Sequence, residues 1–147
     1  MNFEVDTREY VTALKEMVEQ GMEVSMTIFG TSMEPFLIDK RDKIYFRKPE
    51  GEIKKGDMVF YRRESGAYVM HRVMKVKKHQ YYLTGDHQTF LEGPIESTLI
   101  FAKVVAVERA GVWLTEKDRL WKFYAGWWRR LFWVRKVGNK LKRIIGK

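Results

Sequence analysis

Short apolar and β-branched runs, separated by turn residues, fill the chain from residue 22 to residue 116 and constrain its fold most strongly. Runs of this length and composition are typical of strands. Ser65-Gly66 and Ala110-Gly111 can form tight turns between antiparallel neighbours. We therefore expect a mainly β body with strands at residues 22–29, 43–46, 58–62, 67–76, 80–84, 99–107 and about 113–114.

Helical patterns flank this body on both sides. Residues 7–20 carry an apolar stripe at helical spacing, with Thr7 as the expected cap and Gly21 as the expected end. From Asp118 onward, apolar residues again recur at steps of four and three, apart from the turn at Gly138. This stripe consists of Leu120, Tyr124, Trp127, Leu131, Val134, Leu141 and Ile145. The predicted fold is therefore α+β: a domain over residues 1–116 and a helical tail over residues 117–147, with a break expected at Gly138-Asn139.

Length and composition exclude several classes of protein. A chain of 147 residues forms one domain with one substantial core, and the absence of cysteine excludes disulfides and thiolate metal sites. The longest stretch without a charged residue is Val24 to Met33, well below the roughly 20 apolar residues of a membrane-spanning helix. The acidic N-terminus, without an apolar segment, does not predict a secretory signal.

The positive charge is concentrated in the tail. Of the net +9, residues from Lys117 onward contribute eleven Lys and Arg against one acid, so the tail carries +10 and the remainder −1. Four of the five tryptophans also lie there. This asymmetry indicates an appended binding element.

The tail pattern allows three interpretations. An amphipathic helix rich in tryptophan and arginine suits the interface of an anionic membrane. Alternatively, the same apolar face could pack on the body or on another subunit. Third, the positive charge of the tail could attract nucleic acid, although no nucleic-acid-binding motif is present. We favour the membrane surface, and we expect no nucleic acid as partner. The residues expected to bind the membrane are Trp121, Trp127, Trp128, Arg129, Arg130 and Trp133.

Four sequence blocks carry the chemistry. They are Gly30-Thr31-Ser32-Met33-Glu34-Pro35, Gly56-Asp57-Met58-Val59, His71-Arg72-Val73 and Gly85-Asp86. In this order they resemble the clan of serine peptidases that holds the signal peptidases and the self-cleaving repressors, over residues 22 to about 107. The resemblance implies an antiparallel β body and a serine nucleophile. Histidine followed by arginine is similar to the archaeal and endoplasmic-reticulum type of signal peptidase, whereas the other members have lysine there.

The resemblance assigns Ser32 as nucleophile and His71 as general base. A serine hydroxyl needs a nearby base, and neutral imidazole can take its proton and return it to the leaving amine. Taken singly, Ser32 is compatible with an ordinary loop and His71 with a core histidine. Asp86 is the preferred third member because it matches the family's Gly-Asp by type, and Glu92 is its rival. Asp86 could also simply stabilise a turn.

The glycine at position 30 departs from the many signal peptidases that place a serine hydroxyl two residues before the nucleophile. We therefore expect the oxyanion hole to rest on the Ser32 N–H, aided by Thr31. The substrate is expected to lie extended beside residues 22–29, and the resemblance implies small residues before the bond that is cut. The expected substrate-binding residues are Met26, Ile28, Gly30, Met33 and Pro35.

The resulting hypothesis is a serine endopeptidase that cleaves a leader, signal or precursor peptide, on the cytoplasmic side and peripherally attached to the membrane, without a cofactor. A metal site built from the three histidines and Asp86 is not favoured, because no two histidines have ligand-like spacing. Two alternatives stay open: a self-cleaving regulator, and a non-catalytic peptide- or membrane-binding module of the same fold.

Overall fold

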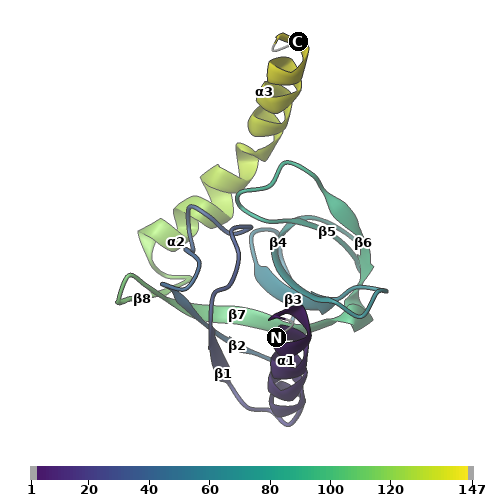
Figure 1. Ribbon diagram of the computed structural model, residues 1–147, viewed down its shortest axis with the longest axis vertical. Helices are drawn as coiled ribbons and strands as arrows, with labels where there is room; N and C mark the ends of the chain where they lie inside the picture. Colours follow the sequence, from purple (N-terminus) through teal and green to yellow (C-terminus); the bar gives the residue numbers. More distant parts are fainter. Residues whose placement is uncertain (1–2, 146–147) are drawn as a thin grey trace.

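A strongly curved antiparallel sheet forms the body of the protein in a computed structural model, which describes the backbone of residues 3–145 and the side chains of residues 8–138 (Figure 1). The strand order is β1-β2-β7-β3-β4-β5-β6, and β8 pairs with β7. The strands are β1 (Val24–Thr27), β2 (Lys43–Arg47), β3 (Met58–Arg62), β4 (Tyr68–Lys77), β5 (Gln80–Thr84), β6 (Glu92–Glu96), β7 (Ile100–Arg109) and β8 (Val112–Thr115). This architecture confirms the predicted β body.

Two apolar clusters hold the sheet together. The larger cluster joins helix α1 (Phe3–Glu19) to β1, β2 and β7 through residues such as Val18, Ile44 and Phe46. The smaller cluster lies among β3, β4 and β5 and includes Tyr61 and Leu83. In Figure 1, β4, β5 and β6 curl into a nearly closed ring above α1. The alternation of side chains along β3 and β4 sends successive residues to different clusters.

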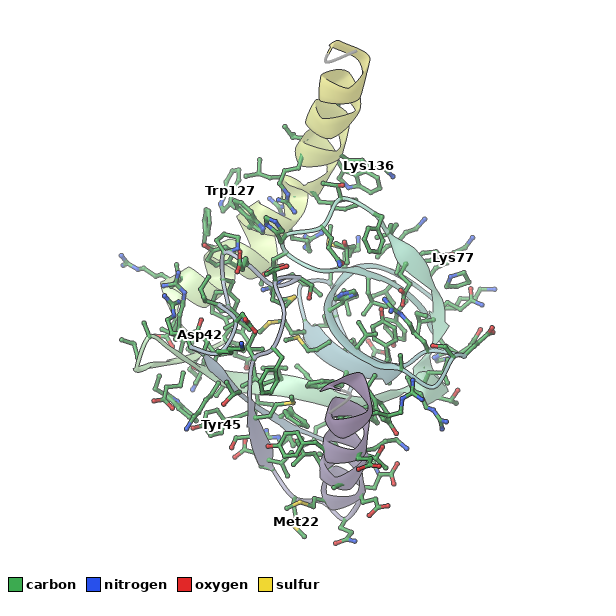
Figure 2. All side chains as sticks on the ribbon, in the orientation of Figure 1. Met22, Asp42, Tyr45, Lys77, Trp127 and Lys136 are labelled. Atoms are coloured by element: carbon green, nitrogen blue, oxygen red, sulfur yellow. The ribbon has the colours of Figure 1, made fainter. Side chains whose placement is uncertain are left out.

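The tail is helical and is docked on the body along its first half. It consists of α2 (Arg119–Phe123), a π-helical turn η2 (Tyr124–Trp128) and α3 (Phe132–Ile145). Phe36 stacks on Tyr124, with 4.8 Å between the ring centroids, and meets the edge of Trp121 at 6.0 Å. Beyond this contact α3 projects away from the body (Figure 1), and Figure 2 shows Trp127 and Lys136 on opposite sides of the tail in this view.

Several boundaries differ from those predicted. Helix α1 begins at Phe3, so Thr7 lies inside it and does not cap it. Strand β6 was not expected, because Gly93 and Pro94 read as a loop. Gly138 lies within α3, and the irregularity of the tail falls at η2 instead.

The π-helical turn changes which residues of the tail face the body. It inserts an extra residue per turn, so the apolar face of α2 does not continue along the predicted stripe. Trp127, Leu131 and Val134 of that stripe are exposed, whereas Phe132 is fully buried. Leu141 and Ile145, also part of the stripe, lie outside the residues whose side chains are described. No helix within residues 3–145 combines the length and hydropathy needed to cross a membrane.

Candidate active site

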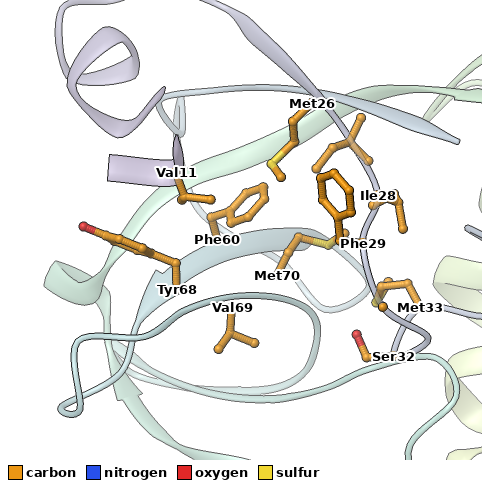
Figure 3. Close-up of a pocket in the computed structure, with 12 residues that line it drawn as sticks. Val11, Met26, Ile28, Phe29, Ser32, Met33, Phe60, Tyr68, Val69 and Met70 are labelled. Atoms are coloured by element: carbon orange, nitrogen blue, oxygen red, sulfur yellow. The ribbon is translucent and has the colours of Figure 1, made fainter. Parts of the chain in front are cut away.

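Ser32 lies on a sharp turn between β1 and β2, in the wall of an apolar pocket (Figure 3). Gly30 turns the chain with a φ of +89°, which side-chain-bearing residues rarely adopt, and its N–H donates to Asp39 Oδ1 at 2.7 Å. In Figure 3 the Ser32 hydroxyl points toward the pocket. The turn therefore presents a partly exposed hydroxyl to a cavity large enough for a side chain.

The turn is held from behind by the loop after β5. The Ser32 carbonyl accepts a hydrogen bond from the His87 N–H at 2.9 Å. A Cβ atom on Gly85 would lie 2.9 Å from the Ser32 Cβ atom, so only glycine allows this approach. Among the described residues, neither the backbone N–H of Ser32 nor its hydroxyl makes a hydrogen bond, and both are available to a ligand.

His71 is a buried residue of β4, with 2% of its surface exposed. It pairs with Val59 of β3, and Tyr61 lies two residues further along the same strand, on the same face. The Tyr61 hydroxyl oxygen is 3.2 Å from His71 Nδ1. Within the described part of the chain this is the one hydrogen bond of the imidazole, so Nε2 has no protein partner.

A second contact of Tyr61 determines which imidazole nitrogen carries the proton. The Tyr61 hydroxyl donates a short hydrogen bond to Glu92 Oε2. Burial and the Glu92 carboxylate raise the pKa of Tyr61, which therefore stays protonated. Because its proton points to Glu92, the Tyr61 oxygen accepts from the Nδ1–H of His71. These two hydrogen bonds leave the lone pair of the imidazole on Nε2, as a general base requires.

Arg63 keeps Glu92 ionised. Its guanidinium lies 2.7 Å from Glu92 Oε1, and its Nε–H donates to the same oxygen at 2.9 Å. Burial alone would raise the pKa of Glu92, but the hydrogen bonds from Arg63 and Tyr61 outweigh burial and lower it. The arrangement is thus His71–Tyr61–Glu92–Arg63, with a tyrosine inserted between imidazole and carboxylate.

Burial lowers the pKa of His71 to about 4, and the Glu92 charge opposes this effect in part. His71 is therefore neutral at physiological pH. In the unfolded chain its pKa returns to its ordinary value of 6.5. Between these two pH values the unfolded state binds a proton that the folded state does not. The contribution of His71 to the free energy of unfolding is therefore fully present above pH 6.5 and is lost as the pH falls toward 4.

We expect the free energy of unfolding to fall by about 2–3 kcal/mol between pH 7 and pH 4.5, as this pKa difference implies at about 1.4 kcal/mol per unit. Urea unfolding at a series of pH values measures the loss. His71→Gln should remove most of this dependence, and His87→Gln, at an exposed histidine, should not. Equal losses in wild type and His71→Gln would contradict the assignment.

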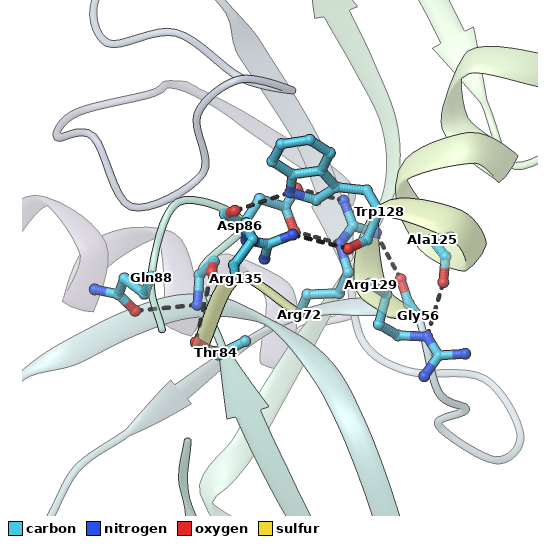
Figure 4. Close-up of polar contacts among 10 residues, drawn as sticks. Gly56, Arg72, Thr84, Asp86, Gln88, Ala125, Trp128, Arg129 and Arg135 are labelled. Atoms are coloured by element: carbon cyan, nitrogen blue, oxygen red, sulfur yellow. Dashed lines mark hydrogen bonds and ion pairs between the residues drawn. The ribbon is translucent and has the colours of Figure 1, made fainter. Parts of the chain in front are cut away.

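Asp86 has a different partner from the one expected. Both of its carboxylate oxygens bond to Arg72, at 2.7 and 2.9 Å, and the pair is almost completely buried (Figure 4). A further N–H of Arg72 donates to the Gly56 carbonyl at 2.7 Å. Asp86, the preferred third member, thus neutralises Arg72, whereas its rival Glu92 reaches His71 through Tyr61.

The tail contacts the same loop. The Trp128 indole N–H donates to the Asp86 carbonyl at 2.8 Å, and the Arg135 guanidinium lies 4.5 Å from the Trp128 ring centroid (Figure 4). Trp121 is buried against Phe36, which follows the Ser32 turn. Trp121 and Trp128 therefore pack on the body, contrary to the expectation that both would meet a membrane.

The predicted site residues meet in one region, although not in direct contact. Ser32 shares its pocket with Val69 and Met70, the two residues before His71 in β4. In the described part of the chain, no hydrogen bond joins Ser32 Oγ to His71. Four of the predicted substrate-binding residues line the pocket, namely Met26, Ile28, Gly30 and Met33, whereas Pro35 does not. Thr31 is exposed beside Ser32.

Sequence reasoning missed Tyr61 and Arg63. Tyr61 belongs to a strand of apolar residues and reads as core, and Arg63 reads as a surface charge after that strand. The available signal is the alternation along paired strands: once His71 is a candidate base, polar residues diagonal to it on β3 are candidates to orient it.

A comparison with protein-family models supports the antiparallel β body. The model of the Peptidase S24-like family matches residues 2–105, which include Ser32, His71, Asp86 and Glu92. No curated protein matches the chain significantly. A match over this much of the chain, together with the antiparallel β body, establishes the relationship. The protein belongs to the S24-like peptidase family.

Proposed function

We propose that the protein is a serine endopeptidase in which Ser32 is the nucleophile, His71 the general base, and Glu92 the carboxylate that acts on His71 through Tyr61. The observation that carries the proposal is the hydrogen-bonded chain from Glu92 to His71 Nδ1, within a match to a peptidase family. His71 is a buried neutral imidazole whose Nε2 has no partner among the described residues, and it directly follows Met70, which lines the pocket together with Ser32. These features support base catalysis more directly than a structural role.

The reaction would proceed through an acyl-enzyme. His71 Nε2 takes the Ser32 hydroxyl proton as Oγ attacks the peptide carbonyl carbon. The resulting imidazolium keeps its Nδ1–H on Tyr61 and is stabilised by the Glu92 charge. It then gives the proton to the leaving amine as the C–N bond breaks. His71 then takes a proton from water, whose oxygen attacks the ester carbonyl carbon. As the C–O bond to Ser32 breaks, His71 returns that proton to Ser32 Oγ, which releases the carboxylic acid product and restores the free hydroxyl.

The unoccupied backbone N–H of Ser32 supports its role in the oxyanion hole. An N–H group that donates to no protein acceptor can donate to a developing oxyanion without first breaking a hydrogen bond. The exposed Thr31 hydroxyl is the neighbouring donor available to assist it. Gly30 offers no side-chain hydroxyl, so these two residues are the donors that we assign.

A fluorophosphonate probe tests the proposal. It should phosphonylate wild-type protein at Ser32, fail to label Ser32→Ala, and label His71→Ala far more slowly, with the modified residue located by mass spectrometry. No labelling of the folded wild type would favour a non-catalytic binding module. Loss of a segment of the chain itself on incubation, dependent on Ser32, would favour the self-cleaving regulator that the S24-like match also supports.

We further propose that the enzyme processes leader, signal or precursor peptides at an anionic membrane surface, held there by the outer face of its tail. This face, which we call the outer tail face, is apolar and exposed. It consists of Trp127, Leu131 and Val134, which recur at steps of four and three along the helix. Arg130 lies 5.9 Å from the Trp127 ring centroid, so cationic and aromatic groups lie together as interfacial helices require.

Trp127→Ser combined with Val134→Ser should weaken binding to vesicles containing anionic lipid by at least about tenfold. Each of these side chains is worth about 1.4 kcal/mol or more when removed from water, and this energy corresponds to a factor of ten. Vesicle sedimentation measures the change. Both residues are more than half exposed, so folding should be unaffected.

The matched control is Trp113→Ser, which removes an equally exposed tryptophan on β8 outside the tail. It should bind vesicles as wild type does. Deleting the whole tail is a poor alternative, because it also removes the buried Trp121, Tyr124 and Phe132. Unchanged vesicle binding by the double variant would exclude the outer tail face as the membrane anchor.

A further inference from the structure

We propose that the pocket beside Ser32 selects a large apolar residue, of the size of leucine or phenylalanine, immediately before the bond that is cut. The inference rests on the proposed peptidase function and concerns its substrate class. The resemblance to signal peptidases implies small residues at that place, so the two expectations differ.

The side chains that line the pocket are almost all apolar. Ser32 and Tyr68 carry the hydroxyl groups of the lining. Every other side chain that lines the pocket is aliphatic, aromatic or a methionine. The lining residues are Val11, Met26, Ile28, Phe29, Gly30, Ser32, Met33, Ile44, Phe60, Tyr68, Val69 and Met70 (Figure 3). No charged side chain faces the cavity from the residues that line it. The site therefore favours an uncharged, apolar occupant.

The pocket is deep because its floor belongs to the main core. Val11, Ile44 and Phe60 are buried residues of the larger apolar cluster, and they come from α1, β2 and β3. Tyr68 closes one side, where the Thr12 hydroxyl lies 3.2 Å from its own hydroxyl and its ring meets the Phe101 ring at 5.6 Å. These contacts fix the wall before a substrate arrives.

The volume of the cavity decides between small and large occupants. It is about 190 Å³. An apolar protein cavity of about 150 Å³ accepts a benzene molecule. A methyl group would leave most of the space beside Ser32 unfilled, whereas an isobutyl or benzyl group would fill it. Each additional buried methylene favours binding, and the expected discrimination is about 10- to 200-fold per group in a well-formed pocket.

The strand order allows a peptide to reach the pocket. β1 is a terminal strand of the sheet and pairs with β2 along one edge. Met26 and Ile28, at and just beyond its end, contribute side chains to the pocket. A peptide that adds to the other edge of β1 would present alternate side chains to the same face, and the residue nearest Ser32 would enter the cavity.

Three methionines, Met26, Met33 and Met70, line the cavity, and this composition has a consequence for selectivity. Methionine is unbranched and adapts to differently shaped occupants. The pocket should therefore accept leucine, methionine and phenylalanine with similar rates, and discriminate mainly by size against alanine and by charge against lysine and glutamate.

A series of peptidyl phosphonates with alanine, leucine or phenylalanine next to phosphorus tests the inference. The second-order rate constant for Ser32 modification should be at least about tenfold larger for leucine and phenylalanine than for alanine. Met70→Trp should narrow the pocket and reverse this order, and Met70→Ala should shift it toward phenylalanine. Met17→Ala, on the exposed part of α1, is the control and should leave the order unchanged.

Binding without chemistry separates this inference from the proposed function. In Ser32→Ala with ¹³C-labelled methionine methyl groups, acetyl-Ala-Leu-amide should bind at least about tenfold more tightly than acetyl-Ala-Ala-amide. The shifts should concentrate on Met26, Met33 and Met70. A preference for alanine in both assays would overturn the pocket assignment, whereas labelling of Ser32 would still support the peptidase function. Tight binding of the leucine peptide without any labelling of Ser32 in the wild type would overturn the peptidase function alone. Absence of binding by either peptide overturns the pocket assignment.

Discussion

Tyr61→Phe is expected to slow phosphonylation of Ser32 by about 100-fold or more while leaving the fold intact. The substitution removes the one oxygen that joins His71 Nδ1 to Glu92. Without it, nothing holds the proton on Nδ1, and the imidazolium loses its link to the carboxylate. Positioned acid–base catalysis is typically worth about 10²- to 10⁴-fold, and an orienting group that leaves the wrong tautomer accounts for losses near the upper figure.

The second-order rate constant with a fluorophosphonate measures this effect, and ¹⁵N chemical shifts of His71 report its tautomer. Tyr81→Phe is the matched control, since Tyr81 is a buried tyrosine of the same apolar cluster whose hydroxyl has no hydrogen bond in the described residues. It should label at the wild-type rate. Glu92→Gln should resemble Tyr61→Phe. A Tyr61→Phe protein with wild-type rate and tautomer would show that Tyr61 has a packing role only.

Asp86→Ala is expected to lower the free energy of unfolding by about 3–5 kcal/mol, as removal of one partner from a buried ion pair typically does. Arg72 and Asp86 expose almost none of their side-chain surface, so the guanidinium would remain buried without its counter-charge. Its remaining contacts are the Gly56 carbonyl and the Phe36 ring, which lies 5.5 Å away. These do not replace a carboxylate.

Urea unfolding measures the loss, and the double variant Asp86→Ala/Arg72→Met should recover much of it by removing the unpaired charge. Glu50→Ala is the control: its contact with Arg47, at 3.9 Å, is exposed to solvent and should contribute little. A folded double variant that labels normally would confirm that Asp86 stabilises the loop without orienting His71. Loss of labelling despite restored stability would return Asp86 to the active site.

The sequence predicts the β body well because strand alternation and turn residues are local properties. Lys43–Arg47 and Met58–Arg62 were expected almost to the residue. β6 was not, because its strand conformation depends on pairing with β5, which overrides the weak β propensity of Gly93 and Pro94.

The residues of the candidate site, like the strands, were predicted only in part. Ser32 and His71 stand out by motif, whereas the choice between Asp86 and Glu92 depends on which cation or hydroxyl each one meets. Spacing along the chain does not encode that choice. On one face of β4, Arg72 forms an ion pair with Asp86. On the other face, Tyr61 joins Glu92 to His71. Successive side chains of β4 point to opposite faces of the strand, and this alternation creates the separation.

The tail shows the limit of periodicity. Its apolar stripe is real, but the π-helical turn at residues 124–128 redirects it, so one set of aromatic residues packs on the body and another faces outward. A pattern of fours and threes cannot reveal an extra residue in one turn. Of the interpretations of the tail, packing on the body therefore holds for its first half, and the outer tail face remains exposed.

The pH dependence of Ser32 phosphonylation tests the pairing of Ser32 with His71 most directly. The second-order rate constant reports ionisations of the free enzyme. We expect the rate constant to be unchanged near neutrality and to fall at low pH with a midpoint near 4, the pKa to which burial lowers His71. His71→Gln should abolish this profile together with most of the rate. Identical profiles and rates for wild type and His71→Gln would contradict the pairing of Ser32 with His71.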